Sequence, residues 1–215
     1  MPKQLFKPSE VQQTFAQLNM RISNEELFEA IVNVPTMTPI ELAAISLPPG
    51  YQLVRIDNRL PAVPFEHFEL VVINHLLREV VYYNRVIIQP DAFLNHLPVT
   101  QILVWRTPNP VHNAALQGLA GKVFTLYLLK NYNVVITDRH QTQQGQNFWL
   151  TRLYEALAAN KFVYGYDMIS CELRQIETPE QIGQVTEWLW GDDDNYQNRL
   201  AIISVMPLPA AEQTS

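Results

Sequence analysis

The first part of the chain is dominated by helical spacing. Apolar positions in residues 1–47 recur every three or four residues, which is typical of amphipathic helices. Ser9 can cap a first helix, and Ser23 begins the capping-box pattern of a second. Thr38 precedes a proline that suits the first position of a third helix. We therefore predict three short helices, ended by the Pro-Pro-Gly sequence at residues 48–50.

The pattern then changes to alternating and β-branched residues, which indicate strands. Residues 51–57 alternate between polar and apolar types, and residues 101–106 form a compact apolar run between prolines. Residues 68–88 contain two strands joined near residues 76–78, with a helix over part of this stretch as the alternative. We predict four strands in this part of the chain.

Helices alternate with short strands in the second half. Amphipathic helices are predicted at residues 113–130, 145–160 and 178–190, and strands at residues 132–137, 162–166 and 199–205. This order predicts an α/β (or α+β) fold, with a mixed central sheet flanked by helices and preceded by an N-terminal helical extension. We expect a sheet of about six or seven strands.

Length and composition set further limits. The 215 residues suit one core, so we predict a single domain over residues 1–206, with residues 1–47 packed on it and a disordered tail at residues 207–215. The net charge of -6 and the scattered basic residues argue against nucleic-acid binding. No signal-peptide pattern and no run of about 18 apolar residues is present. The single cysteine, Cys171, fits a reducing compartment. We expect a soluble, cytoplasmic protein.

Metal binding has little support in the sequence. The five histidines lack the short spacings of zinc ligands. The acidic run Asp192-Asp193-Asp194 lacks the central glycine and the terminal glutamate of an EF-hand loop. We interpret this run as a solvated turn and expect no metal.

A glycine-containing turn before a predicted helix is the strongest candidate for a ligand site. It consists of Gln117, Gly118, Leu119, Ala120, Gly121 and Lys122. Glycines there allow close backbone approach, and the free amides of a helix start favour a phosphate or pyrophosphate. The alternative is that the two glycines only permit close packing of the helix against the sheet.

The stretch from Arg106 to Tyr166 resembles the core of the GNAT family of N-acetyltransferases, in which a strand, a pyrophosphate-binding turn and a helix form the acyl-CoA site. The family turn reads Gln or Arg, two residues, Gly, one residue, then Gly or Ala. Here Gln117 matches, whereas Ala120 and Lys122 occupy the two glycine positions. The family's later tyrosine is echoed by Tyr154, although the Gly-Phe that follows it in the family is absent.

The pattern of residues 135–139 and 145–149 also resembles divergent acetyltransferase-like proteins of bacteriophages. The resemblance implies a GNAT-like fold that binds acetyl-CoA at residues 117–122. It implies that Tyr154 is a catalytic general acid, which protonates the departing thiolate. The alternative for Tyr154 is a packing residue with its ring in the core and its hydroxyl at the surface.

Two further residues follow a predicted strand, at the edge where ligands bind in open α/β sheets. Asp138 can orient His140, which titrates near neutrality and is a candidate catalytic base. The alternative is that Asp138 caps a turn while His140 faces water.

Two hypotheses for function follow. The first is an acyl-CoA-dependent N-acyltransferase with a degenerate cofactor motif. The second is a non-catalytic module on the same scaffold that binds a protein partner, as a phage accessory or host-directed factor. Trp188 and Trp190 are two apart on a helix, so we expect one to be buried and the other to be partly exposed as a partner contact.

Overall fold

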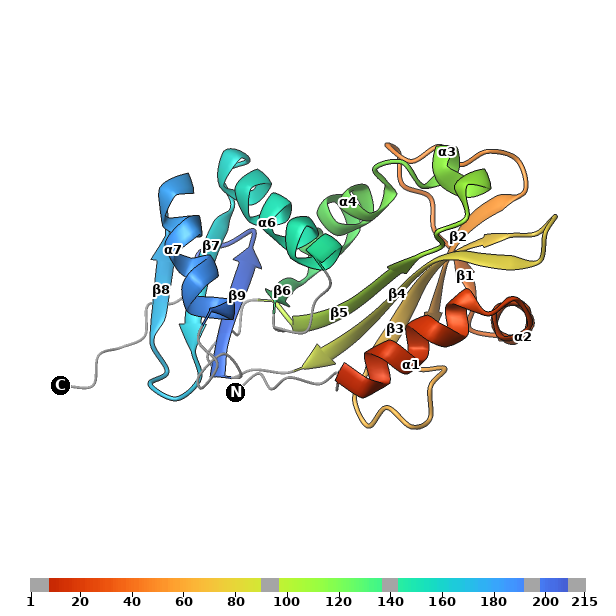
Figure 1. Cartoon of the computed structure of the whole chain (residues 1–215), viewed down its shortest axis with the longest axis horizontal. Coiled ribbons are helices and arrows are strands. Elements are labelled where there is room, and N and C mark those ends of the chain that lie inside the picture. The colour runs from red at the N-terminus through yellow and green to blue at the C-terminus, as the bar shows by residue number, and fades with distance from the viewer. Residues whose placement is uncertain (1–7, 90–96, 137–142, 192–197, 209–215) are drawn as a thin grey trace. The chain divides into compact units, whose positions relative to one another are not determined.

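The chain forms an α+β fold around a nine-stranded mixed sheet, which agrees with the predicted fold class. The computed structural model describes residues 8–89, 97–136, 143–191 and 198–208 (Figure 1). The strands are β1 Thr38–Pro39, β2 Tyr51–Asp57, β3 His67–Asn74, β4 Glu79–Gln89, β5 Val99–Arg106, β6 Asn133–Ile136, β7 Phe162–Asp167, β8 Leu173–Ile176 and β9 Arg199–Ser204. Their order in the sheet is β1-β2-β3-β4-β5-β6-β9-β7-β8.

Helical segments connect and flank these strands. The α-helices are α1 Pro8–Asn19, α2 Arg21–Val32, α3 Asn113–Leu116, α4 Leu119–Val123, α5 Leu129–Asn131, α6 Gln143–Ala158 and α7 Pro179–Trp190. A 3-10 turn, η1 Pro110–His112, precedes α3, and a π-helical segment, η2 Phe124–Leu128, joins α4 to α5. Within the described residues, none of these helices has the length and apolar character needed to cross a membrane.

The chain divides into two compact units. Unit 1 comprises residues 1–4, 89–101 and 128–215, and unit 2 comprises residues 5–88 and 102–127. Strand β5 therefore contributes its first part to unit 1 and its second part to unit 2.

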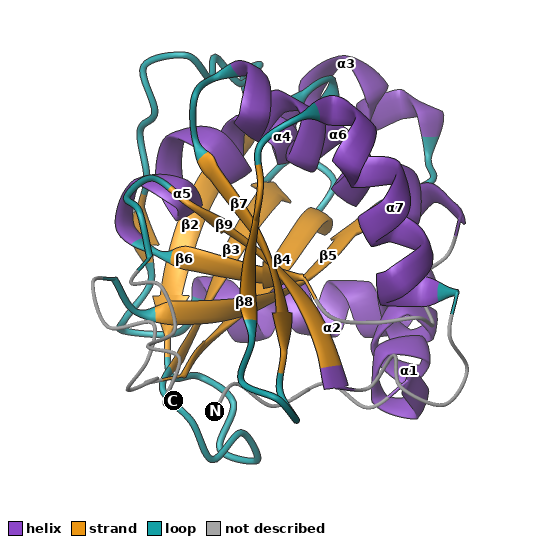
Figure 2. Ribbon diagram, turned by 90° about the vertical axis from the view of Figure 1, so that its left-hand side faces the viewer, coloured by secondary structure: helices purple, strands orange, loops and turns teal. Residues whose placement is uncertain are grey.

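In unit 2 an antiparallel meander of β2, β3 and β4 is covered by helices on both faces. Every residue of β3 is buried, as its continuous apolar run requires. Phe28 and Ile31 of α2 pack on one face against Val71. On the other face the ring of Tyr127 contacts the ring of Phe68. Figures 1 and 2 show α1 and α2 on the opposite side of these strands from α3 and α4.

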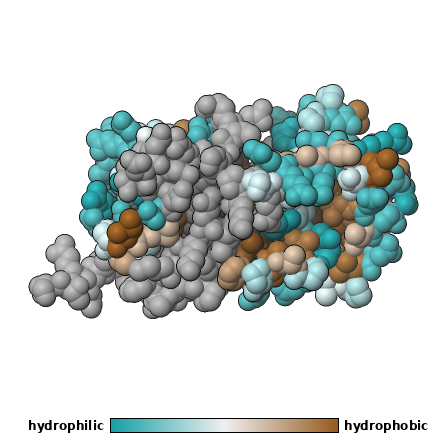
Figure 3. All heavy atoms as spheres, turned by 60° about the horizontal axis from the view of Figure 1, so that its bottom comes forward, coloured by the Kyte–Doolittle hydropathy of each residue, from teal (hydrophilic) through white to brown (hydrophobic). Residues whose placement is uncertain are grey.

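The outer surface of unit 2 carries several exposed apolar side chains. Ile22 of α2 is 72% exposed, and Leu76, in the turn between β3 and β4, is 78% exposed. This turn lies against α2, because Arg78 pairs with Glu25 and Glu29. The space-filling view shows apolar residues exposed among polar ones on this part of the molecule (Figure 3).

Two of the three predicted N-terminal helices are present. Helix α2 begins at Arg21, before the expected cap, so Ser23 lies inside the first turn and the capping-box prediction is wrong. The third predicted helix is also wrong. Thr38 and Pro39 instead form the edge strand β1, paired with Arg55 and Val54. An edge strand tolerates Pro39, which has no amide hydrogen to donate.

Unit 1 contains the antiparallel strands β6, β9, β7 and β8, with the start of β5 parallel to β6. The sequence pattern missed β8. Helix α7 begins as predicted, with a capping box between Thr178 and Gln181. In the predicted tail, Leu208 is buried and its amide donates to the Tyr164 hydroxyl at 3.0 Å, so the tail is ordered there. Residues 209–215 lie outside the described residues.

The side chain of Asn24 connects α2 to the sheet. Its Nδ2 donates to the Leu18 and Val80 carbonyls, both at 2.9 Å, and its Oδ1 accepts from the Val80 amide at 2.8 Å. We expect Asn24→Ala to lower the free energy of unfolding by about 2–3 kcal/mol, because it leaves buried backbone groups without partners. Chemical denaturation measures this loss. Asn33→Ala, which removes an exposed bond to the Glu29 carbonyl, is the matched control and should cost less than about 1 kcal/mol.

Candidate functional site

The predicted cofactor turn is a break between two helical segments of unit 2. Helix α3 ends at Leu116, and Gln117 is extended. Gly118 then takes a left-handed conformation with φ of 66°. The continuous helix predicted for residues 113–130 is therefore interrupted at this turn. The break places a new helix start at Leu119. The predicted phosphate or pyrophosphate site requires a helix start within this turn.

The helical run after Gly118 is continuous through α4, η2 and α5, from Leu119 to Asn131. The Lys122 amide donates to the Gly118 carbonyl at 3.1 Å, which closes the first turn. The amides of the first turn of a helix have no intrahelical acceptor and attract anions. π-Helical segments such as η2 are frequent near functional sites.

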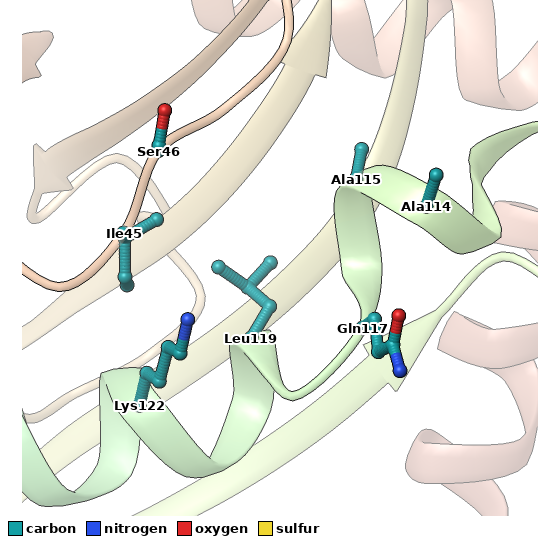
Figure 4. Close-up of a pocket in the computed structure, with 7 residues that line it drawn as sticks. All are labelled: Ile45, Ser46, Ala114, Ala115, Gln117, Leu119 and Lys122. Carbon is teal, nitrogen blue, oxygen red and sulfur yellow. The ribbon is translucent and has the colours of Figure 1, made fainter.

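A pocket of about 330 Å³ opens beside this turn (Figure 4). Gln117, Leu119 and Lys122 of the predicted set line it, together with Ala114 and Ala115 of α3. The other three predicted turn residues, Gly118, Ala120 and Gly121, are not among the lining residues.

The opposite wall of the pocket comes from the loop before β2, through Ile45 and Ser46. Figure 4 shows the Lys122 side chain extending from α4 toward this loop. Sequence reasoning missed both loop residues, because it placed this part of the chain in a helix. Pro39 was the residue that could have indicated a strand, because proline is accepted in edge strands and Pro39 lies in one.

The pocket offers several groups that suit an anion. The Lys122 ammonium is its charged lining side chain, and the side chains of Ser46 and Gln117 add hydrogen-bond donors. Leu119 and the two alanines provide apolar walls. A ligand with a phosphate group and an apolar portion matches this lining.

The predicted general acid, Tyr154, belongs to α6 in unit 1 and is 45% exposed. Its neighbour Leu153 is fully buried, so the two residues lie on different faces of the helix. The alternative that placed the Tyr154 ring in the core is therefore wrong. Exposure leaves the hydroxyl accessible to a substrate.

Only some of the other candidate residues lie in the part of the chain that the structure describes. Asp138 and His140 lie outside the described residues, as does the acidic run at residues 192–194. Trp188 and Trp190 are both half-buried, so the prediction that one of them is buried is wrong, whereas partial exposure of the other is observed. Trp188 packs against Gly165 and carries the Arg199 guanidinium over its ring. Within the described ranges, no three His, Cys, Asp or Glu side chains are arranged to hold a metal ion.

The conformation of Gly118 provides a test of the turn. A methyl group at this position meets nothing within 4 Å, so the cost of Gly118→Ala comes from backbone conformation alone. We expect it to lower the free energy of unfolding by about 1–2 kcal/mol. The control is Gly183→Ala, in the interior of α7 and equally free of steric contact, which should raise stability by about 0.5–1 kcal/mol. Equal effects of the two substitutions in urea denaturation would contradict the left-handed turn.

The chain has no match among protein-family models, curated proteins or solved structures. The resemblance of residues 106–166 to the GNAT family therefore stays a prediction. The pocket of unit 2, with the groups that line it, is the candidate site.

Proposed function

We propose that the pocket beside the Gln117–Lys122 turn binds the pyrophosphate of acetyl-CoA and that the chain is an N-acyltransferase. The observation that carries this proposal is the coincidence of the pocket with the predicted turn. Three of the six predicted residues line it, including the cationic Lys122.

The energetics favour an anionic ligand over a neutral one. A hydrogen bond to a charged group contributes about 1.5–3 kcal/mol, so the Lys122 ammonium is the largest single contribution. Amides at a helix start add about 0.3–1 kcal/mol for a negative charge. The chain carries a net charge of -6, so anion binding here depends on these local groups and not on the overall field.

The order of elements around the turn also supports the proposal. Strand β5 leads into the turn, the helical run follows, and the chain then enters β6, which runs parallel to the start of β5. A strand, a turn and a helix in this order are the parts that the GNAT resemblance implies. The resemblance assigns protonation of the departing thiolate to Tyr154, which belongs to unit 1 and is 45% exposed. Asp138 and His140 stay candidates for the base.

Acetyl-CoA should stabilise the folded chain. A ligand at 100 times its Kd raises the free energy of unfolding by about 2.7 kcal/mol, which is a shift of several degrees in Tm for a chain of this size. We expect this shift at millimolar acetyl-CoA in the wild type and its loss in Lys122→Glu. Lys130→Glu, at another exposed lysine, is the control and should keep the shift. Absence of any shift in the wild type would remove the proposal.

A second candidate function is a protein-interaction module, and a specific observation favours it. Ile22 and Leu76 are more than two-thirds exposed, and both flank the contact between α2 and the β3–β4 turn. Exposed apolar groups that gather on one surface are typical of protein-binding sites.

The double variant Ile22→Glu, Leu76→Glu tests this second function. It should lose any partner that co-purifies stoichiometrically with the wild type, because two buried charges oppose an apolar interface. Lys122→Glu should retain that partner. Retention of the partner by the double variant, measured by affinity purification and mass spectrometry, would argue against this surface.

A further inference from the structure

Three side chains from separate segments of unit 2 form one hydrogen-bonded chain. The Tyr51 hydroxyl lies 2.8 Å from His112 Nδ1, and His112 Nε2 lies 2.9 Å from Glu79 Oε2. The Tyr51 and His112 rings meet edge to face, with centroids 5.8 Å apart. Tyr51 begins β2, Glu79 begins β4 and His112 ends η1.

The strand register explains why Tyr51 and Glu79 face each other. Both residues pair with Asn74 of β3, one from each side. Directly opposed residues in antiparallel strands point to the same face of the sheet, so Tyr51 and Glu79 lie on one face, two strand spacings or about 10 Å apart. The imidazole of His112 bridges this gap.

The hydrogen bonds assign the tautomer of His112. An ionised carboxylate only accepts hydrogen bonds, so the bond to Glu79 requires a proton on Nε2. In the neutral ring Nδ1 is then the acceptor, and the Tyr51 hydroxyl donates to it. The His112 side chain is fully buried, whereas Tyr51 is half-buried and Glu79 is 34% exposed. The buried base therefore connects a half-buried tyrosine to a carboxylate that is partly exposed.

This connectivity is that of an acid, a histidine and a hydroxyl nucleophile. In serine hydrolases the acid binds Nδ1 and the nucleophile binds Nε2. Here Glu79 binds Nε2 and Tyr51 binds Nδ1, but the proton transfer is of the same kind. His112 can take the phenol proton as the oxygen attacks, and Glu79 stabilises the imidazolium that forms.

We propose that Tyr51 is a nucleophile that accepts acyl groups from activated esters or thioesters. Its Oη attacks the carbonyl carbon, a new C–O bond forms, and the bond to the leaving thiolate or phenolate breaks. The phenol proton passes to His112 Nδ1 and from there to the leaving group. Water or an amine then attacks the carbonyl carbon of the acyl-tyrosine, and the bond between this carbon and Tyr51 Oη breaks. The proton of the attacking group passes through His112 to Oη, which restores the phenol and releases a carboxylic acid or an amide.

Tyr51 lies close to the pocket along the chain. His112 precedes the pocket residue Ala114 by two positions, which is at most about 7 Å of chain, and Tyr51 follows Ser46 by five. The inference itself does not need acetyl-CoA to bind, because it rests on the three side chains alone.

p-Nitrophenyl acetate tests the proposal without the cofactor pocket. We expect a burst of nitrophenolate, and mass spectrometry should find the acetyl group on Tyr51. The rate at Tyr51 should exceed that at Tyr154 at least about tenfold, because Tyr154 is 45% exposed but has no hydrogen bond to a histidine among the residues that the structure describes. Tyr51→Phe should remove the burst.

Glu79→Gln tests whether Tyr51 is labelled because His112 activates its hydroxyl or only because reagent can reach it. The amide has no negative charge to stabilise the imidazolium, and if its NH2 group donates to His112 the ring also loses its acceptor for the phenol, so labelling should fall at least about tenfold. Glu26→Gln, at an exposed position of α2, should leave labelling unchanged. Circular dichroism of each variant checks folding, and Glu79→Gln remains informative if a variant of the buried His112 does not fold.

Unchanged labelling in Glu79→Gln, or labelling of Tyr154 as fast as that of Tyr51, would overturn the proposal and leave the chain of bonds as a tether. Lys122→Glu distinguishes this proposal from the acetyl-CoA site. It should lose the thermal shift with acetyl-CoA and keep the labelling of Tyr51.

Discussion

The burial of β3 on both faces is the constraint on which unit 2 depends. Its apolar residues can leave water only if helices cover both sides of the meander, and α1 with α2 and the run after Gly118 supply the two covers. Burial of a single large apolar side chain contributes about 1.5–3 kcal/mol, so a strand of this kind fixes the position of its neighbours. The register of β2 and β4 against β3 follows from that burial, and the register brings Tyr51 and Glu79 to one face.

The same burial explains the network around Glu69. This carboxylate is fully buried in β3, and an isolated charge there costs several kcal/mol. Arg59 binds both of its oxygens at 2.7 Å, and the Tyr83 hydroxyl donates to it at 2.5 Å. Burial, and then the charge of Glu69, raises the pKa of Tyr83. The neutral phenol is thus favoured in the folded state, and its stabilising contribution is lost only as the pH rises above the ordinary range near 10.

The two proposed sites share their supporting segments. The residues before β2 supply a wall of the pocket and then Tyr51, and the chain after β5 supplies His112 and then the Gln117–Lys122 turn. One site offers the Lys122 cation, and the other offers the histidine and the phenol that we propose as base and nucleophile. Binding of the pyrophosphate of an acyl donor and acceptance of its acyl group can belong to one acyl-transfer reaction. The two proposals are therefore chemically compatible, although each rests on its own observations.

Local sequence patterns determined much of the fold. Alternation identified β2 with its observed bounds, the β-branched run identified β3 and β4, and the predicted start of the last helix at Thr178 agrees with α7. These features depend on neighbouring residues, whose spacing the sequence displays directly. The glycine pattern likewise marks the turn at residues 117–122, beside which the pocket opens.

Tertiary structure decided the rest. Thr38 joined an edge strand because Arg55 and Val54 offered it partners, and Ile45 and Ser46 became a pocket wall only as a result. Tyr51 and His112 are 61 positions apart, and His112 and Glu79 are 33 apart, so no local pattern connects them. Their contact depends on strand register, which is set by burial of a whole sheet and is not encoded in any short stretch of the chain.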